Sequence, residues 1–274
     1  MQMGTPPPPF FQFHARGNRP PLYFFNGSLV GGHLCVQRMA EIFGPDYPII
    51  SIDPHGRYGE PIPPSIEEMA ADRLPLILER QASGPFLLGG QCNGALVAFE
   101  AARLLMAAGH KVDLVAMVDP PTVNARPVPR AILGPVRPMV SPYLLLWTYQ
   151  RMCQLEAFFN ASTSEKIAKL LKRLSGRITY LTPPALWDAW SAISIAMARY
   201  LPAPLEVPVT FYAAGYDGRA WRLSSQLEVI EVPGGHSDCL TIGAKLLVDD
   251  LRQRIDVLAD RASVVEPHAF ANAG

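Results

Sequence analysis

The sequence has little of what marks several common classes of protein. Only four of its 274 residues are cysteines and none forms a CxxC pair, so a disulfide scaffold is not expected. Twenty-four Lys and Arg residues balance twenty-four Asp and Glu residues, and no long basic run occurs, which argues against a nucleic-acid-binding protein. No uncharged apolar stretch reaches the roughly 18 residues of a membrane span.

Targeting and cofactor signals are also missing. The first residues, MQMGTPPPPFFQF, lack the basic start, long apolar segment and cleavage site of a secretion signal. Together with the sparse cysteines, this predicts a cytoplasmic protein that contacts neither membrane nor nucleic acid. No His, Cys or Asp cluster has metal-ligand spacing, and the loop GSLVGG is not a phosphate loop. We therefore expect no metal and no cofactor on the chain itself.

Short apolar runs, in contrast, are plentiful, and they alternate with helical patterns. Near-continuous apolar runs of this length are typical of strands covered on both faces, so the alternation predicts an α/β protein with a mostly parallel sheet between helices. A further segment, 10–14, is a candidate edge strand. The six main runs lie at 22–26, 48–53, 85–90, 112–119, 207–215 and 227–232.

The helical patterns carry their own end signals. Ser65 followed by Glu68 predicts a capping box at the start of a helix over 65–81, which Pro75 is expected to kink or end. A second helix is predicted over 93–108, and Gly109 is its candidate C-terminal cap. Other helical patterns cover 33–43 and about 238–262.

One long segment, about 122–204, interrupts the alternation. Seven of the 28 prolines lie between 120 and 142, and helical patterns follow at 144–160, 163–176 and 185–200. Because sheet strands precede and follow this segment, we interpret it as an insertion on a single domain over 10–262. Residues 1–9 are then a Pro-rich tail and residues 263–274 a C-terminal tail.

The clearest chemical signal is Gly90-Gln91-Cys92-Asn93-Gly94, between a predicted strand and a predicted helix. This is the setting of the G-x-S-x-G nucleophile elbow, with cysteine in place of serine. The turn is sharp and brings helix and sheet close together, which requires small residues on both sides of the nucleophile. Cys92 is therefore the predicted nucleophile, and Gln91 is a candidate substrate-binding residue.

A thiol nucleophile needs a base, and the base needs an orienting acid. His236 follows the last predicted strand, which places it at the same sheet edge as Cys92. Two aspartates also reach that edge: Asp119 ends the strand after the elbow helix, and Asp217 follows a later strand. Position alone does not separate these two candidates for the acid.

The expected oxyanion hole combines two backbone amides. One is the amide of Asn93, directly after the nucleophile. The other comes from the glycine-rich loop at 26–32, where we assign Ser28 with Leu29 as the alternative. Leu29 and the nearby His33 are also candidates to line the substrate site.

At this point the chain resembles the thioesterase domains of nonribosomal peptide and polyketide synthases and their stand-alone relatives. The resemblance extends over about 12–262 and implies an α/β-hydrolase fold with a mobile helical lid at 122–204. In that family the acid commonly ends the strand after the elbow helix, which favours Asp119 over Asp217. The matching blocks are RPPLYFFNG, SIEEMAADRLPLI, GPFLLGGQCNGALVAFEAARLL, DLVAMVDPP and VPGGHSDCL.

Two departures from the family pattern affect the chemistry. Asn26-Gly27 stands where a His-Gly pair is common, so a different hydrogen bond is expected to support the loop. Cys92 stands where serine is usual, although cysteine variants of the elbow occur. Attack of a thiolate on a thioester yields another thioester, so the acyl group stays activated for transfer to an amine, a thiol or a hydroxyl.

The resemblance implies acyl transfer from a phosphopantetheine thioester in natural-product biosynthesis, ending in hydrolysis, cyclisation or transfer. The chain shows no obvious carrier module, so the acyl or peptidyl carrier protein is expected as a separate partner, with a small-molecule acyl acceptor as a further one. Two alternatives stay open: an esterase or lipase acting on free oxoesters, and a non-catalytic acyl-binding protein.

The lid segment offers two weaker signals. A basic stretch is either a contact for an acidic carrier or a solvated helix face; it comprises Lys166, Lys169, Lys172, Arg173 and Arg177. Aromatic residues of the segment either line an apolar chamber for the acyl group or simply pack the lid together. They are Tyr143, Trp147, Tyr149, Phe158, Phe159, Trp187, Trp190 and Tyr200.

Overall fold

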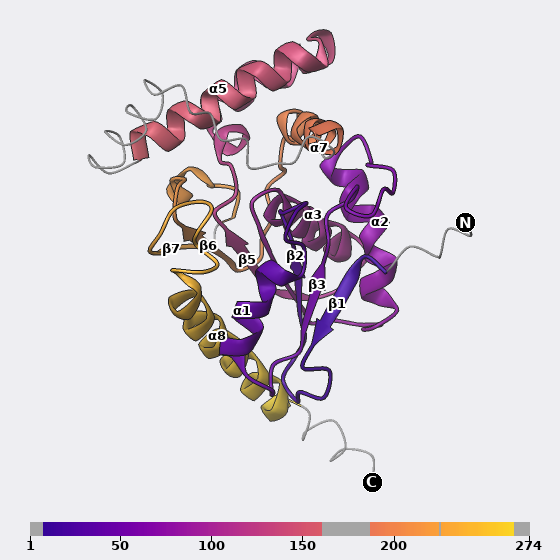
Figure 1. Cartoon of the computed structure of the whole chain (residues 1–274). Coiled ribbons are helices and arrows are strands. Elements are labelled where there is room, and N and C mark those ends of the chain that lie inside the picture. The colour runs from indigo at the N-terminus through magenta and orange to yellow at the C-terminus, as the bar shows by residue number, and fades with distance from the viewer. Residues whose placement is uncertain (1–7, 161–186, 225, 266–274) are drawn as a thin grey trace.

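A seven-stranded sheet forms the centre of the molecule (Figure 1). The computed structural model describes residues 8–160, 187–224 and 226–265. The strand order is β1-β3-β2-β4-β5-β6-β7, and all neighbours are parallel except the edge strand β1, which pairs antiparallel with β3. The predicted parallel sheet and its edge strand are confirmed. The strands are β1 Phe10–Phe13, β2 Leu22–Phe25, β3 Ile49–Ile52, β4 Phe86–Gln91, β5 Val112–Val118, β6 Val209–Ala213 and β7 Leu227–Glu231.

Helices cover both faces of the sheet. Helices α1 (Leu34–Phe43) and α8 (Ala244–Val265) pack side by side on one face and share an apolar core with it. Helices α2 (Ile66–Leu78) and α3 (Asn93–Ala107) share the second core on the other face. The two cores explain why the inner strands carry apolar residues in continuous runs.

Several local signals act as the sequence predicts. The Ser65 hydroxyl accepts the Glu68 amide at 3.1 Å and so caps α2, which continues past Pro75 to end at Leu78. Gly109 has a φ of +85°, a backbone conformation open to glycine, and its amide bonds the Met106 carbonyl at the end of α3. One boundary differs: residues 238–243 form turns, so α8 begins only at Ala244.

The insertion is built from helices that lie beyond one end of the sheet (Figure 1). Its described helices are α4 (Pro127–Val136), α5 (Pro142–Asn160) and α7 (Trp187–Arg199), with short 3-10 turns at Val123–Ala125 and Arg137–Met139. Another 3-10 turn, Gly218–Ala220, follows β6. The predicted helix at 163–176 and the basic stretch at 166–177 lie outside the described residues.

Two polar side chains tie helices of the insertion to the segment that follows β5. The Asn124 amide group donates to carbonyls at the end of α7, those of Met197, Ala198 and Tyr200. The buried Glu156 of α5 accepts from Thr122 and from the Arg126 guanidinium, on the segment that leaves β5. The insertion is thus anchored only a few residues from the sheet edge.

Four of the seven lid aromatics whose side chains the structure describes do not face inward. Tyr143, Trp147, Phe158 and Phe159 are exposed, and the side chain of Trp187 lies outside the described part of the structure. The inward-facing ones are Tyr149 and Tyr200, which are buried, and Trp190, which packs partly buried against the core. Helix α5 is apolar on several sides, so its sequence pattern does not reveal which aromatics turn inward.

Candidate active site

Cys92 sits at a strained turn between β4 and α3. Its φ and ψ are +54° and −124°, a conformation that non-glycine residues adopt rarely and that is typical of constrained functional sites. The neighbouring glycines have no room for a side chain: a Cβ on Gly90 would lie 2.5 Å from the Gly94 carbonyl carbon, and one on Gly94 would lie 2.2 Å from the Phe25 oxygen. The predicted strand–elbow–helix geometry is present.

His236 and Asp119 meet at the same sheet edge. The Nδ1 of His236 lies 2.7 Å from Oδ2 of Asp119 and donates to it. The other carboxylate oxygen accepts three backbone amides, from Ala214, Gly215 and Tyr216, at 2.7–3.0 Å. Asp119 is completely buried, so these four hydrogen bonds replace its hydration and hold it in a fixed orientation.

Asp217 has a different role. Its carboxylate accepts the Arg219 amide at 3.1 Å and caps the short turn at Gly218–Ala220. It also pairs with the exposed Arg219 side chain. Of the two candidate acids, the structure therefore places Asp119, and not Asp217, against His236.

The imidazole of His236 also hydrogen-bonds the Cys92 thiol. Burial of the ring alone lowers the pKa of His236, but the adjacent Cys92 sulfur and the Asp119 carboxylate outweigh this and raise the pKa to about 11. An edge of the Tyr216 ring contacts the imidazole, with the ring centres 5.4 Å apart. The arrangement thus favours a charged imidazolium beside the Cys92 sulfur.

The glycine-rich loop approaches Cys92 directly. A Cβ on Gly27 would lie 2.9 Å from the Cβ of Cys92, so the start of the loop packs directly against the elbow. The Asn93 amide belongs to the first turn of α3, where backbone N–H groups have no partner within the helix. The assignment of the Ser28 and Asn93 amides to an oxyanion hole stays a prediction.

Asn26, the residue that departs from the family pattern, anchors this loop from its start. Its side-chain amide donates to the Ser51 hydroxyl at 2.6 Å and to the Asp53 carboxylate at 3.1 Å, and all three residues are buried. The sequence predicts that another hydrogen bond replaces the one supplied by a His-Gly pair. The bonds from Asn26 confirm that expectation.

The three candidate substrate-binding side chains are distributed around the elbow. Gln91 donates to the His236 carbonyl at 3.4 Å and points toward Cys239, so it supports the histidine loop. Leu29 is buried in the core, and the partly exposed His33 stacks on the Phe11 ring. Their contact with substrate stays a prediction.

Sequence reasoning missed two groups close to the nucleophile. Tyr216 and Cys153 interact electrostatically with Cys92, as does the buried Tyr149, which hydrogen-bonds the Cys153 thiol. Burial raises the pKa of Cys153 to about 12, so this thiol is protonated near neutral pH. The sequence could have indicated Tyr216, because it follows β6 at the same sheet edge where Asp119 follows β5. It could also have indicated Cys153, which lies one helical turn after Tyr149 on α5.

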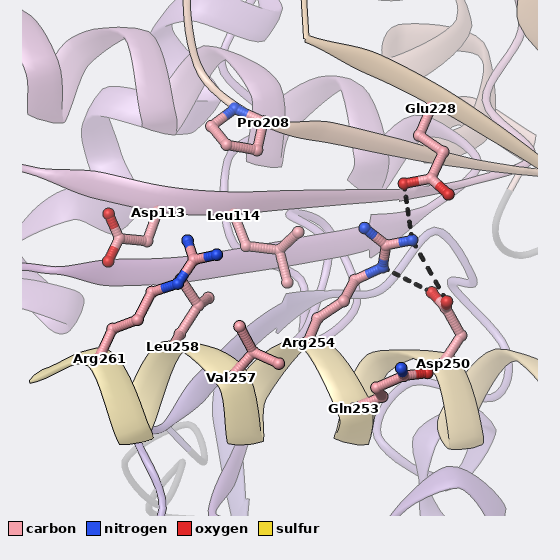
Figure 2. Close-up of a pocket in the computed structure, with 10 residues that line it drawn as sticks. All are labelled: Asp113, Leu114, Pro208, Glu228, Asp250, Gln253, Arg254, Val257, Leu258 and Arg261. Carbon is pink, nitrogen blue, oxygen red and sulfur yellow. Dashed lines mark hydrogen bonds and ion pairs between the residues drawn. The ribbon is translucent and has the colours of Figure 1, made fainter.

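A separate pocket of about 410 Å³ lies at the opposite edge of the sheet, where β5, β6 and β7 begin (Figure 2). Figure 2 shows Arg254 of α8 between two carboxylates, with ion pairs of 2.9 Å to Glu228 and 2.7 Å to Asp250. The positive charge of Arg254, at the centre of this pocket, is thus already paired with carboxylates of the chain itself. The pocket contains none of the predicted site residues.

Within the described residues, no cluster of three or more His, Cys, Asp or Glu side chains has the arrangement of a metal site. None of the described helices combines the length and apolarity needed to cross a membrane.

The sheet order, the strained elbow and the Cys92–His236–Asp119 contacts define a protein of the α/β-hydrolase fold. The sequence profile described as "Thioesterase domain" matches residues 20–163, slightly more than half of the chain. The chain belongs to this thioesterase domain family, and membership supports an enzyme of the hydrolase and thioesterase class. The match includes Cys92 and Asp119, whereas His236 lies beyond it.

Relatives of known function are large synthases. The chain is 26% identical over 194 residues to the non-reducing polyketide synthase atnG of Arthrinium sp, an alignment that covers 65% of the chain and 9% of that protein. It is 33% identical over 117 residues to indigoidine synthase of Dickeya dadantii, covering 42% of the chain and 8% of that protein. The chain thus spans under a tenth of the length of these relatives.

Solved thioesterases share the fold. The NocB thioesterase domain, in covalent complex with a fluorophosphonate nocardicin G analogue, superposes with a TM-score of 0.59 at 17% identity, covering 90% of this chain and 99% of that one. The type II thioesterase BorB from the borrelidin biosynthetic cluster gives a TM-score of 0.56 at 18% identity, covering 90% and 97%. At these identities the likeness concerns the fold.

Proposed function

We propose that this protein releases acyl or peptidyl chains from the phosphopantetheine thioester of a carrier protein, through an acyl-enzyme on Cys92. The observation that carries the proposal is a continuous line of hydrogen bonds from Cys92 through His236 to the buried Asp119. Cys92, at one end of this line, lies at the N-terminus of α3. A nucleophile, a base and an orienting acid in this order are the parts that covalent acyl transfer requires.

In the first half-reaction, the Cys92 thiolate attacks the thioester carbonyl and forms a new carbon–sulfur bond. The oxyanion that develops is stabilised by the backbone amides of Ser28 and Asn93. As the intermediate collapses, the bond to the carrier arm breaks, and the imidazolium of His236 gives its proton to the departing pantetheine sulfur.

In the second half-reaction, an acceptor attacks the acyl group on Cys92. His236 is then neutral and takes the proton of the attacking water, hydroxyl or amine. The bond from the carbonyl carbon to the Cys92 sulfur breaks, which restores the thiolate and the imidazolium. Water gives the free acid, an internal nucleophile gives a ring, and a separate small molecule gives a transfer product.

A cysteine nucleophile affects whether water or another acceptor takes the acyl group from the enzyme. Exchange of one thioester for another is close to isoenergetic, whereas formation of a serine ester releases free energy. The Cys92 acyl-enzyme therefore keeps the acyl group activated, and we propose transfer to an amine, a thiol or an internal hydroxyl in addition to hydrolysis.

The partner and compartment belong to the proposal as well. The matched synthases supply the context in which such domains occur, and we propose a carrier protein that acts in trans in the cytoplasm as the partner. The phosphopantetheine arm belongs to that partner, so the enzyme itself uses no cofactor.

The test compares acyl-pantetheine thioesters with matched oxoesters at equal acyl chain, with release followed by liquid chromatography. Thioester turnover that exceeds oxoester turnover and disappears in Cys92→Ala supports the proposal, and Cys35→Ala is the matched control because Cys35 lies on α1 outside the Cys92–His236–Asp119 line. Preference for oxoesters would support the esterase alternative. Tight binding without turnover would support the acyl-binding alternative.

A further inference from the structure

We propose that Arg57 is a positioning residue that holds the glycine-rich loop in the shape needed to bind the oxyanion. The inference rests on the proposed function, since it assigns a role in the same acyl transfer. Arg57 follows β3 in a turn, and its side chain reaches over the loop that carries Ser28.

The contacts of Arg57 with the loop are direct. Its Nη1 donates to the carbonyls of Leu29 and Val30, at 2.8 and 2.9 Å. One terminal nitrogen carries two N–H groups, so it serves both carbonyls at once. The guanidinium thereby fixes two consecutive peptide groups of the loop.

Fixing carbonyls also fixes amides. In a trans peptide the C=O and the following N–H point in opposite directions, so carbonyls held on one side direct their amides to the other. The Ser28 carbonyl is held as well, by the Gly32 amide at 3.2 Å. With these three successive carbonyls held, the amides of Leu29, Val30 and Gly31 are held as well, and Leu29 is the alternative donor to the oxyanion.

The guanidinium is itself anchored by a buried carboxylate. Asp53 is only 2% exposed, and its Oδ2 lies 3.3 Å from the Nε of Arg57 and accepts the Tyr58 hydroxyl at 2.7 Å. The other oxygen of Asp53 accepts the side-chain amide of Asn26 at 3.1 Å. Asp53 therefore joins Asn26, at the start of the loop, to Arg57, which holds its middle.

The loop is also shaped to fit the guanidinium. Gly32 has a φ of +51°, and a Cβ there would lie 2.3 Å from the Cζ of Arg57. The Gly32 backbone therefore packs directly against the guanidinium, and its positive φ also favours glycine at this position. Lysine has neither this planar group nor an Nε donor, so it cannot hold both loop carbonyls and Asp53 together.

Comparing two reactions of Cys92 distinguishes the proposed role of Arg57 from that of His236 and Asp119, which support the Cys92 thiolate. Acyl transfer passes through a tetrahedral oxyanion, whereas alkylation by iodoacetamide needs the thiolate but forms no such oxyanion. A residue that only positions the oxyanion loop therefore affects the first reaction and spares the second. Residues that support the imidazolium affect both.

The experiment measures both rates in Arg57→Met, in Arg57→Lys and in the control Arg38→Met, which removes an exposed arginine of α1. We expect the rate of Cys92 acylation by an acyl-pantetheine thioester to fall about 10- to 100-fold in Arg57→Met, and less in Arg57→Lys. Alkylation and thermal midpoint should stay within twofold and a few degrees of the unsubstituted protein, as in Arg38→Met.

Equal losses in acylation and alkylation, or no loss of acylation, would overturn this inference alone. If Arg57→Met does not fold, Arg57→Lys decides, because it keeps the charge and one donor. An unsubstituted protein that no acyl thioester acylates would overturn the inference together with the proposed function.

Discussion

Asp119 presents one oxygen to His236 and the other to three consecutive backbone amides, those of Ala214, Gly215 and Tyr216. The strand β5 and the turn after β6 are thereby joined at the residue that orients the imidazole. The carboxylate is completely buried, so these hydrogen bonds take the place of water around it.

Asp119→Asn should therefore reduce kcat/KM by about 10³-fold or more, because an amide NH₂ facing His236 imposes the wrong tautomer. Asp217→Asn should stay close to the unsubstituted rate, since Asp217 caps only the turn at Gly218–Ala220. Steady-state kinetics with one thioester measures both. A larger loss in Asp217→Asn would reverse the assignment of the acid.

The charge state of His236 gives a prediction about pH. Its pKa is raised above the ordinary 6.5, so the imidazolium persists as the pH rises through neutrality and loses its proton only at alkaline pH. Because the Cys92 sulfur is the leading cause of the increase, Cys92→Ala should lower the pKa of His236. Nitrogen-15 NMR of labelled histidine checks this; midpoints near 6.5 in both proteins would contradict it.

The nucleophile can be exchanged to test its effect on product choice. Cys92→Ser forms an ester intermediate, which is less activated toward amines than a thioester. With an amine and water competing, the ratio of amide to free acid should fall in Cys92→Ser relative to the unsubstituted enzyme. Mass spectrometry of the products gives this ratio, and an unchanged or increased ratio would show that cysteine does not favour transfer.

Glu156 is predicted to hold helix α5 of the lid to the segment that follows β5. Removing it in Glu156→Ala leaves Thr122 and Arg126 without their partner and should lower the free energy of unfolding by about 1–3 kcal/mol. Glu231→Ala is the control, because its ion pair with Arg219 is exposed and its loss should cost under about 1 kcal/mol. Urea denaturation measures both; equal effects would remove Glu156 as an anchor.

The close packing of the elbow predicts a stability difference between two glycines. Gly94→Ala places a Cβ 2.2 Å from the Phe25 oxygen and should destabilise the fold by about 1–3 kcal/mol. Gly134→Ala, inside α4, brings its Cβ only to 3.8 Å from Leu201 and should be neutral or stabilising. Thermal unfolding distinguishes them, and a tolerated Gly94→Ala would mean that the elbow is looser than described.

A site residue can be predicted from the sequence when a local motif marks it, and not when its role depends on contacts between distant segments. The elbow around Cys92 and the histidine loop have local motifs next to strands, so their positions could be predicted. The acid could not be chosen from position alone, because Asp119 and Asp217 both follow strands at the same edge. Only the three-dimensional contact of Asp119 with His236 separates them.

The rest of the site depends on contacts between distant segments. Arg57 lies in a polar turn with no motif, and its link to the loop at 28–32 exists only after β2 and β3 pair. Tyr149 and Trp147 are both lid aromatics of one apolar helix, yet only Tyr149 turns inward. The register of α5 against the sheet decides this, and the hydrophobic pattern does not encode it.

The most direct test of the central claim is to locate the acyl group on the protein. The unsubstituted enzyme is mixed with an acyl-pantetheine thioester, quenched in acid, digested and analysed by peptide mass spectrometry. The account predicts the mass of one acyl group on the peptide that contains Cys92, and none in Cys92→Ala. An acyl group carried on Cys153 or Cys239 instead, or one that persists in Cys92→Ala, would contradict Cys92 as the nucleophile.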